Sequence, residues 1–157
     1  MDALLGLLLK HKFKGSRRRL NIATDQPVKV SGKSKFLVTP VMSDCVTEGL
    51  IFDACREQNL DFEFTHLAVN HNVCCTPHRD GRNRGESRIL FLGDFQGGDL
   101  HFEDGTHFNE TGRWFSFDPQ MLHWNSPVTA GDKYSIVAYK HAKITAFGLR
   151  NKEPVET

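Results

Sequence analysis

The spacing of hydrophobic and polar residues predicts a helix that ends near residue 60. Between residues 43 and 60, apolar side chains recur at helical spacing, at Val46, Leu50, Ile51 and Ala54. Ser43 or Asp44 can cap the start of this segment, because a side-chain oxygen there accepts a hydrogen bond from a free backbone N–H. We therefore expect a helix over Ser43–Leu60.

From residue 62 onward the pattern changes to short runs of β-branched and aromatic residues, separated by turn residues. The runs predict strands at Phe62–Val69, Arg88–Leu92, Asp99–Glu103, Arg113–Phe117, Gln120–Trp124 and Tyr134–Tyr139. Their aromatic side chains alternate with polar ones, so we expect them to pack the core. A helix followed by closely spaced strands predicts an α+β domain with an antiparallel barrel or jelly-roll-like sandwich.

The first 35 residues differ from the rest in charge. They carry nine Lys or Arg against Asp2 and Asp25, which gives +7 in a chain whose net charge is +1. We expect residues 1–35 to form a basic N-terminal arm or irregular lead-in, 36–149 the folded domain and 150–157 a polar tail. Basic residues at 10–35 can contact nucleic-acid phosphates, but a targeting signal or a solvated tail gives the same charge.

Two short segments lie near the ends of this basic region. Ala3–Leu9 is apolar and resembles part of a signal peptide, but its basic residues follow it, which favours a short amphipathic helix or the start of an incomplete gene model. Phe36–Thr39 predicts a short strand. No run of 18 apolar residues occurs, so we expect no transmembrane helix and no membrane partner. The length of 157 residues suits one globular domain.

The four cysteines are few for a disulfide scaffold and fit a reducing compartment, so we expect an intracellular protein, nuclear or cytoplasmic. Cys74 and Cys75 lie just before His78, which raises zinc as an alternative. No second ligand pair at the usual zinc spacing follows them.

One triplet offers metal ligands of another kind. In an extended segment, His78 and Asp80 of His78-Arg79-Asp80 point to the same side and can reach one ion. A second histidine, His123, would complete a facial triad that leaves coordination positions open, as in non-haem iron(II) oxygenases. His101-Phe102-Glu103 is locally an equally good pair.

The order of motifs favours the first pair. Ten residues after His123, Lys133 and Ser135 share one face of a predicted strand, so a cation and a hydroxyl can hold one carboxylate together. Additional motifs are Val69-Asn70-His71-Asn72, Asn83-Arg84-Gly85-Glu86-Ser87, Leu92-Gly93-Asp94-Phe95 and Gly97-Gly98-Asp99-Leu100. From about Thr65 to His141, the chain resembles the iron(II)/2-oxoglutarate-dependent dioxygenases. It is most similar to their TET/JBP group, which oxidises methyl groups of pyrimidine bases.

The resemblance implies a double-stranded β-helix, jelly-roll or cupin-like, with an N-terminal helix packed on it. It also implies iron(II), 2-oxoglutarate and dioxygen as reactants, with ascorbate as a reductant. Carried over by position, the site residues fall into three sets. The iron ligands are His78, Asp80 and His123. The 2-oxoglutarate contacts are Lys133, Ser135 and Arg88. The substrate contacts are Asn70, Asn72 and Asn83.

Two positions keep alternatives open. Family members usually have Arg where this chain has Lys133, and lysine keeps the charge but loses the bidentate fork. Asn70 and Asn72 can equally hydrogen-bond backbone groups in a turn, as Asn commonly does.

The expected activity is hydroxylation of the methyl group of thymine or 5-methylcytosine, in DNA rather than RNA. A base within a duplex would have to be flipped out to reach the metal. One alternative is a hydroxylase of a protein side chain or small molecule. Another is a binding module without turnover, because fold does not fix function.

Overall fold

The computed structural model describes residues 2–10, 19–23, 45–81 and 83–141. Two helices occur there, α1 (Asp2–Lys10) and α2 (Cys45–Gln58). The strands are β1 (Arg19–Ala23), β2 (His66–His71), β3 (Asn83–Gly97), β4 (Leu100–Phe102), β5 (His107–Phe108), β6 (Trp114–Phe117), β7 (His123–Asn125) and β8 (Val128–His141).

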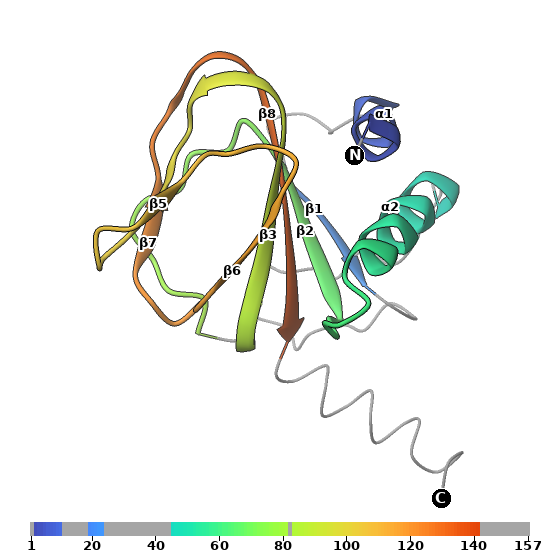
Figure 1. Cartoon of the computed structure of the whole chain (residues 1–157), viewed down its shortest axis with the longest axis horizontal. Helices are drawn as coiled ribbons and strands as arrows, with labels where there is room; N and C mark the ends of the chain where they lie inside the picture. Colours follow the sequence, from blue (N-terminus) through green and yellow to red (C-terminus); the bar gives the residue numbers. More distant parts are fainter. Residues whose placement is uncertain (1, 11–18, 24–44, 82, 142–157) are drawn as a thin grey trace, which may run out of the picture.

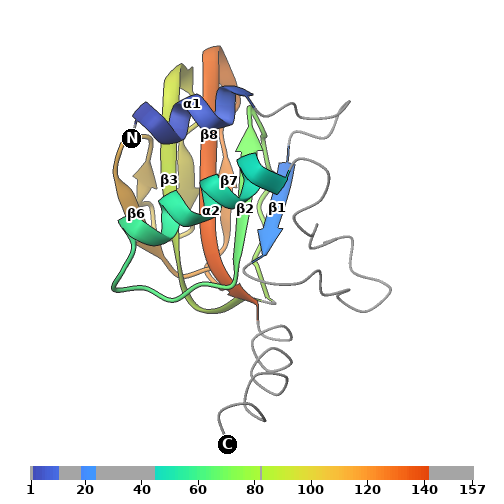
Figure 2. The ribbon, with the colours of Figure 1, turned by 90° about the vertical axis from the view of Figure 1, so that its right-hand side faces the viewer.

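The strands form two antiparallel sheets that face each other (Figure 1). The major sheet has the order β1-β2-β8-β3-β6, and the minor sheet has the order β5-β4-β7. Both helices cover the outer face of the major sheet, as the side view of Figure 2 shows. This is the predicted α+β architecture, a jelly-roll or cupin-like core with helices packed on it.

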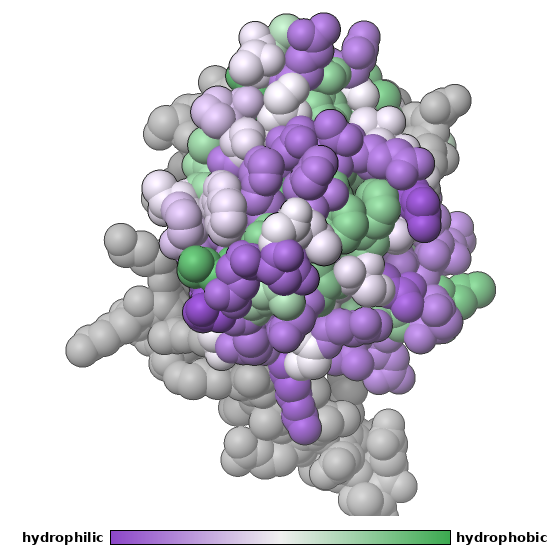
Figure 3. Space-filling model, turned by 60° about the vertical axis from the view of Figure 1, so that its left-hand side comes forward, coloured by the Kyte–Doolittle hydropathy of each residue, from purple (hydrophilic) through white to green (hydrophobic). Residues whose placement is uncertain are grey.

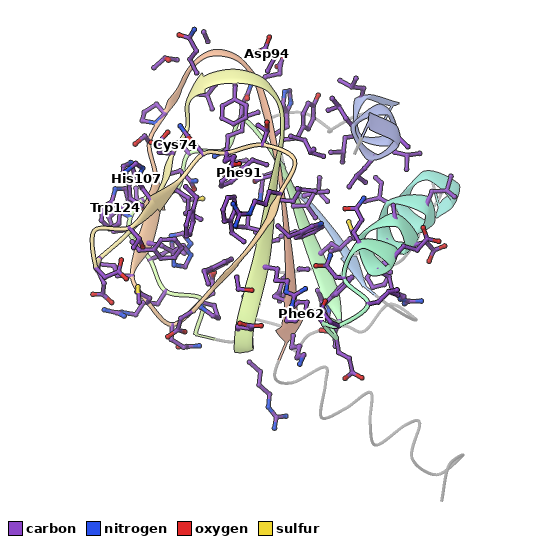
Figure 4. The ribbon with its side chains drawn as sticks, viewed as in Figure 1. Phe62, Cys74, Phe91, Asp94, His107 and Trp124 are labelled. Atoms are coloured by element: carbon purple, nitrogen blue, oxygen red, sulfur yellow. The ribbon has the colours of Figure 1, made fainter. Side chains whose placement is uncertain are left out.

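The central strands of the major sheet are buried on both faces, and each face belongs to a different core. Toward the helices, Ile136 of β8 and Leu90 of β3 pack with Leu4, Leu8 and Ile51. Toward the minor sheet, a second cluster contains Ile89, Phe91, Leu100, Phe102 and Phe117. Figure 4 shows Phe91 between the two sheets. Alternate residues of β3 and β8 therefore serve different cores, as the two-residue period of a strand requires.

Glycine is required where β3 and β8 approach most closely. A Cβ added to Gly93 would lie 2.2 Å from the Asp132 carbonyl oxygen, and one added to Gly131 would lie 2.1 Å from that of Asp94. Both glycines also have positive φ, 104° and 79°, which other residues rarely adopt. Gly131 lies two residues before Lys133 in β8, so this close approach of the strands directly precedes Lys133 and Ser135.

The predicted helix and strands are present, with shifted ends. The helix predicted for Ser43–Leu60 runs from Cys45 to Gln58. The strand predicted from Phe62 starts at His66. Phe62 and Phe64 instead pack in the helix-side core, where Phe64 also meets the ring of Phe52. The short strand β5 was not predicted.

Two parts of the first 35 residues, the region expected to form a basic arm or an irregular lead-in, have regular secondary structure. Residues 19–23 form β1, which pairs with β2 along its whole length. Ala3–Leu9 lies in helix α1, as expected, and Leu4 and Leu8 are fully enclosed in the core. These parts therefore belong to the folded domain. The strand predicted for Phe36–Thr39 and the tail predicted for 150–157 lie outside the described residues.

None of the helices in the described ranges is both long and apolar enough to cross a membrane.

Candidate metal centre

The structure places the two predicted histidine ligands directly opposite each other. His78 lies just before β3 and forms an isolated antiparallel bridge with His123 at the start of β7. Each backbone N–H donates to the other residue's carbonyl, at 2.9 and 3.0 Å. Asp80 follows two residues after His78, and its N–H donates to the Pro119 carbonyl at 2.8 Å. Backbone pairing thus joins segments that are far apart in the sequence.

The three side chains converge as metal ligands do. His123 Nε2 lies 3.2 Å from one carboxylate oxygen of Asp80, and His78 Nε2 lies 3.6 Å from the other. One ligand atom from each residue lies within 4.8 Å of the other two. With metal–ligand bonds of about 2.1 Å, adjacent ligand atoms in an octahedral ion are about 3 Å apart. The observed distances therefore need only small adjustments to hold one ion.

Hydrogen bonds to the backbone select the right form of both imidazoles. The Nδ1–H of His78 donates to the Thr76 carbonyl and that of His123 to the Met121 carbonyl, both at 2.7 Å. A carbonyl only accepts, so Nδ1 carries the proton and Nε2 of the neutral ring keeps its lone pair. Such contacts to the second nitrogen are usual for metal-binding histidines.

Protonation of His123 competes with metal binding. Burial lowers the pKa of this imidazole, but hydrogen bonds to Asp80 and to the Met121 carbonyl, with the Asp80 charge, raise it by more, so the net pKa lies above its ordinary value. Only the neutral ring can ligate, so metal affinity is expected to fall as His123 is protonated.

The rival pair His101 and Glu103 has other partners. His101 Nε2 lies 2.7 Å from the Ser126 hydroxyl, and its ring stacks on Trp124. Glu103 accepts hydrogen bonds from Arg79. Within the described part of the chain, His78, Asp80 and His123 are the only three-ligand group, so Cys74 and Cys75 belong to none. The three residues predicted from the motif order are therefore the ones that the fold brings together.

The triad opens into a cavity of about 410 Å³ between the sheets, a volume usual for small-molecule sites. Predicted site residues in its wall, apart from the triad, are Asn70, Asn83 and Ser135. Others that line it are Ala68, Val73, Cys75, Arg79, Gly81, Ile89, Leu100, Phe117, Asn125, Val137 and Tyr139. The space-filling view in Figure 3 shows mostly hydrophilic side chains over the minor-sheet side, with smaller apolar areas between them.

Asn125 and Tyr139 are cavity residues that sequence reasoning did not single out. Each continues a face already identified, Asn125 two residues after His123 and Tyr139 four residues after Ser135. The two-residue period of a strand was the signal that could have found them.

Lys133 and Ser135 share the inner face of β8, as predicted, but they have different surroundings. Ser135 lines the cavity and its hydroxyl accepts a hydrogen bond from the Asn70 amide at 3.3 Å. Lys133 is only 3% exposed, donates from Nζ to the Gly98 carbonyl and lies 4.6 Å from the centre of the Phe91 ring. Lys133 is not part of the cavity wall. Burial lowers the pKa of this ammonium to about 8.

Asn72 takes the structural role that the sequence left open. Its side-chain oxygen accepts a hydrogen bond from the Lys133 N–H at 2.7 Å, and its own N–H donates to the Lys133 carbonyl at 2.8 Å. Its φ of 52° is left-handed, which Asn tolerates better than most residues. The side-chain oxygen of Asn72 thus closes this turn, and Asn72 is not among the residues that line the cavity.

Arg88, the third predicted 2-oxoglutarate contact, lies among other partners in the structure. Its guanidinium forms two hydrogen bonds with the Asp61 carboxylate, at 2.9 and 3.0 Å, and lies over the Phe62 ring. Phe62 belongs to the helix-side core. Ile89, which follows Arg88 in β3, lines the cavity. Adjacent residues in a strand face opposite sides, so Arg88 points away from the metal site.

Comparisons with known proteins give a fold but no family. No protein-family model matches the chain, and no curated protein matches its sequence. NgTET1 in complex with 5mC DNA has a TM-score of 0.56 and 15% identity over 89% of this chain. The match covers 65% of the NgTET1 chain, less than two thirds of its length.

Two further solved structures have similar folds. An oxidoreductase of the 2OG-Fe(II) oxygenase family from Burkholderia pseudomallei matches with a TM-score of 0.59 and 14% identity, over 88% of this chain and 75% of its own. The viral collagen prolyl hydroxylase vCPH from Paramecium Bursaria Chlorella virus-1, as its 2OG complex, matches with a TM-score of 0.54 and 16% identity, over 88% and 89%. At such identities, the likeness shows the fold alone.

Proposed function

We propose that this chain is an iron(II)- and 2-oxoglutarate-dependent dioxygenase that hydroxylates a C–H bond. The observation that carries the proposal is the convergence of two Nε2 atoms and one carboxylate at the wall of a 410 Å³ cavity. Nitrogen and oxygen ligands in the ratio of two to one suit iron(II), with positions left for a co-substrate and dioxygen.

His78, Asp80 and His123 would hold the iron, which supplies the activation of dioxygen. In the overall reaction, 2-oxoglutarate, dioxygen and the substrate C–H group give succinate, carbon dioxide and an alcohol. One oxygen atom enters succinate and the other enters the alcohol. The protein's task is to position the C–H bond and exclude water.

Lys133 and Ser135 would hold the far carboxylate of 2-oxoglutarate. The Ser135 hydroxyl already faces the cavity. The Lys133 ammonium would turn from the Gly98 carbonyl toward the incoming carboxylate, because an ion pair there replaces a neutral acceptor with a charged one.

The proposed substrate is the methyl group of 5-methylcytosine or thymine in DNA. The fold shared with NgTET1 in complex with 5mC DNA supports this choice. The amides of Asn70, Asn83 and Asn125 in the cavity wall can hydrogen-bond the edge of a flipped base. Basic residues at 10–35 would contact the phosphates, and a nuclear or cytoplasmic location fits this substrate.

The second candidate is hydroxylation of a protein side chain or small molecule. It is favoured by the same likeness in fold to a viral collagen prolyl hydroxylase. Both candidates share the metal chemistry and differ in what enters the cavity. A binding module without turnover is the third candidate.

Release of succinate tests the chemistry. We expect purified protein with iron(II), ascorbate and 2-oxoglutarate to release succinate, and Asp80→Ala and His78→Ala to abolish it. His101→Ala is the matched control, because it removes a histidine that lies outside the triad and should leave turnover intact. Absence of succinate with folded, metal-loaded protein would favour the binding module.

Mass spectrometry of nucleosides tests the substrate. We expect hydroxymethyl products after incubation with DNA that contains thymine and 5-methylcytosine. Turnover of 2-oxoglutarate without modified nucleosides would favour the second candidate. Binding to DNA should weaken steeply with salt and should be lost when the Lys and Arg residues within 10–35 are replaced by neutral ones.

A further inference from the structure

The residue between the two ligands of the H-x-D triplet has a defined partner. Arg79 donates to both carboxylate oxygens of Glu103, at 3.2 and 3.4 Å, and to the Gln120 carbonyl at 2.6 Å. Glu103 directly follows β4, and Gln120 lies in the turn before β7. The side chain therefore ties the triplet to both segments that lie beside His123.

Glu103 extends this connection to the residue before His123. Its carboxylate accepts a hydrogen bond from the Leu122 N–H at 3.1 Å, and its own N–H donates to the Leu122 carbonyl at 3.0 Å. Together with the backbone bridge between His78 and His123, these contacts close a ring. The ring runs from one histidine ligand through Arg79, Glu103 and Leu122 to the other.

The Arg79–Glu103 contact is better suited to positioning the H-x-D triplet than to stabilising the fold. Arg79 is 51% exposed and Glu103 is 42% exposed, and exposed ion pairs add little to folding. A forked guanidinium–carboxylate contact is nevertheless directional, because two parallel hydrogen bonds fix both distance and orientation. Such a contact suits an element that holds a loop in place.

We infer that Arg79 and Glu103 form a clamp that sets the spacing of the metal ligands before the metal binds. The inference rests on the proposed metal site. Both are positioning residues, since they act through His78, Asp80 and His123. Without the clamp, the triplet can leave its place beside β7, and metal binding then has to order it again. The expected loss is one of metal affinity.

Titration with cobalt(II), followed by visible absorption, tests the clamp without any turnover. We expect Arg79→Ala and Glu103→Gln each to weaken cobalt(II) binding about ten- to a hundredfold, as loss of groups around metal ligands usually does. The melting temperature of the metal-free protein should change little. Because the two residues share the guanidinium–carboxylate contact, the double variant should lose less affinity than the sum of the two single losses.

A second exposed ion pair provides the matched control. Arg113 and Glu110 lie 3.7 Å apart, with both side chains more than 60% exposed. Arg113→Ala should leave cobalt(II) affinity unchanged, and Arg79→Lys should recover part of it, because lysine keeps the charge and one contact.

Three results would overturn the inference. One is wild-type affinity in Arg79→Ala and Glu103→Gln, with cobalt(II) bound normally by the wild type; the proposed function would then stand. Another is additive losses in the double variant. The third is absence of cobalt(II) binding by the folded wild type, which would overturn the proposed metal site as well.

Discussion

Replacing Lys133 by methionine removes a buried charge from the space between the sheets, and its effect on stability should depend on pH. Burial lowers the pKa of Lys133 from 10.5 to about 8. At about 1.4 kcal/mol for each pKa unit, the fall in pKa corresponds to about 3 kcal/mol against the charged form. The nearby charge of Asp99 offsets only part of this effect of burial on the pKa.

The direction in which stability changes with pH depends on which state, folded or unfolded, keeps the Lys133 proton. Between pH 8 and 10.5, the unfolded chain keeps the Lys133 proton and the folded chain has lost it, so the free energy of unfolding rises with pH. Below about pH 8 both states carry the proton and the full cost is present. The wild type should therefore gain about 3 kcal/mol relative to Lys133→Met between pH 7 and 11.

Chemical denaturation of the two proteins at several pH values measures this difference. Comparing the two proteins cancels the titration of groups that they share, and it also cancels any fixed cost of losing the hydrogen bond to Gly98. A difference in unfolding free energy that stays constant from pH 7 to 11 would refute the reasoning. It would mean that Lys133 is solvated in the folded protein.

Three further predictions concern single groups. The KM for 2-oxoglutarate should rise as pH increases above about 8, because Lys133 then loses the charge that would hold the carboxylate; a flat profile in steady-state kinetics would exclude that role. Gly131→Ala should lower the melting temperature clearly, since its Cβ would lie 2.1 Å from the Asp94 carbonyl oxygen; unchanged melting would mean that the strands can separate there at little cost. Arg88→Ala removes the ion pair with Asp61 and should leave the KM for 2-oxoglutarate unchanged. A raised KM would support the predicted contact between Arg88 and 2-oxoglutarate.

The convergence of His78, Asp80 and His123 could be predicted, because their spacing along the chain and the order of the motifs around them can be read from the sequence. His78 and Asp80 are two residues apart, and an extended backbone brings them to one side whatever the rest of the fold does. His123 was chosen over other histidines by its position before Lys133 and Ser135. His101 and Glu103 have the same local spacing, but the fold pairs His123 with His78 and gives His101 and Glu103 other partners.

Contacts made across the fold could not be predicted. Arg88 lies on the right strand, but which face points to the helices depends on the register between β3 and β8. Asn72 is committed to the backbone of Lys133, which lies 61 residues away in the sequence. Strand β1 was predicted to be part of a basic arm because of the charge around it, although Leu20 and Ile22 alternate with Arg19 and Asn21. Its pairing with β2 makes it a strand.

The central claim is that His78, Asp80 and His123 hold an iron(II) ion to which 2-oxoglutarate binds. Anaerobic addition of iron(II) and 2-oxoglutarate tests it directly, because chelation of iron(II) by the keto acid gives a visible charge-transfer absorption. In the wild type and in His101→Ala, we predict absorption that saturates at one iron(II) ion per chain. In Asp80→Ala, we predict no such absorption. Absorption that is independent of Asp80, or absent from the folded wild type, would contradict the claim.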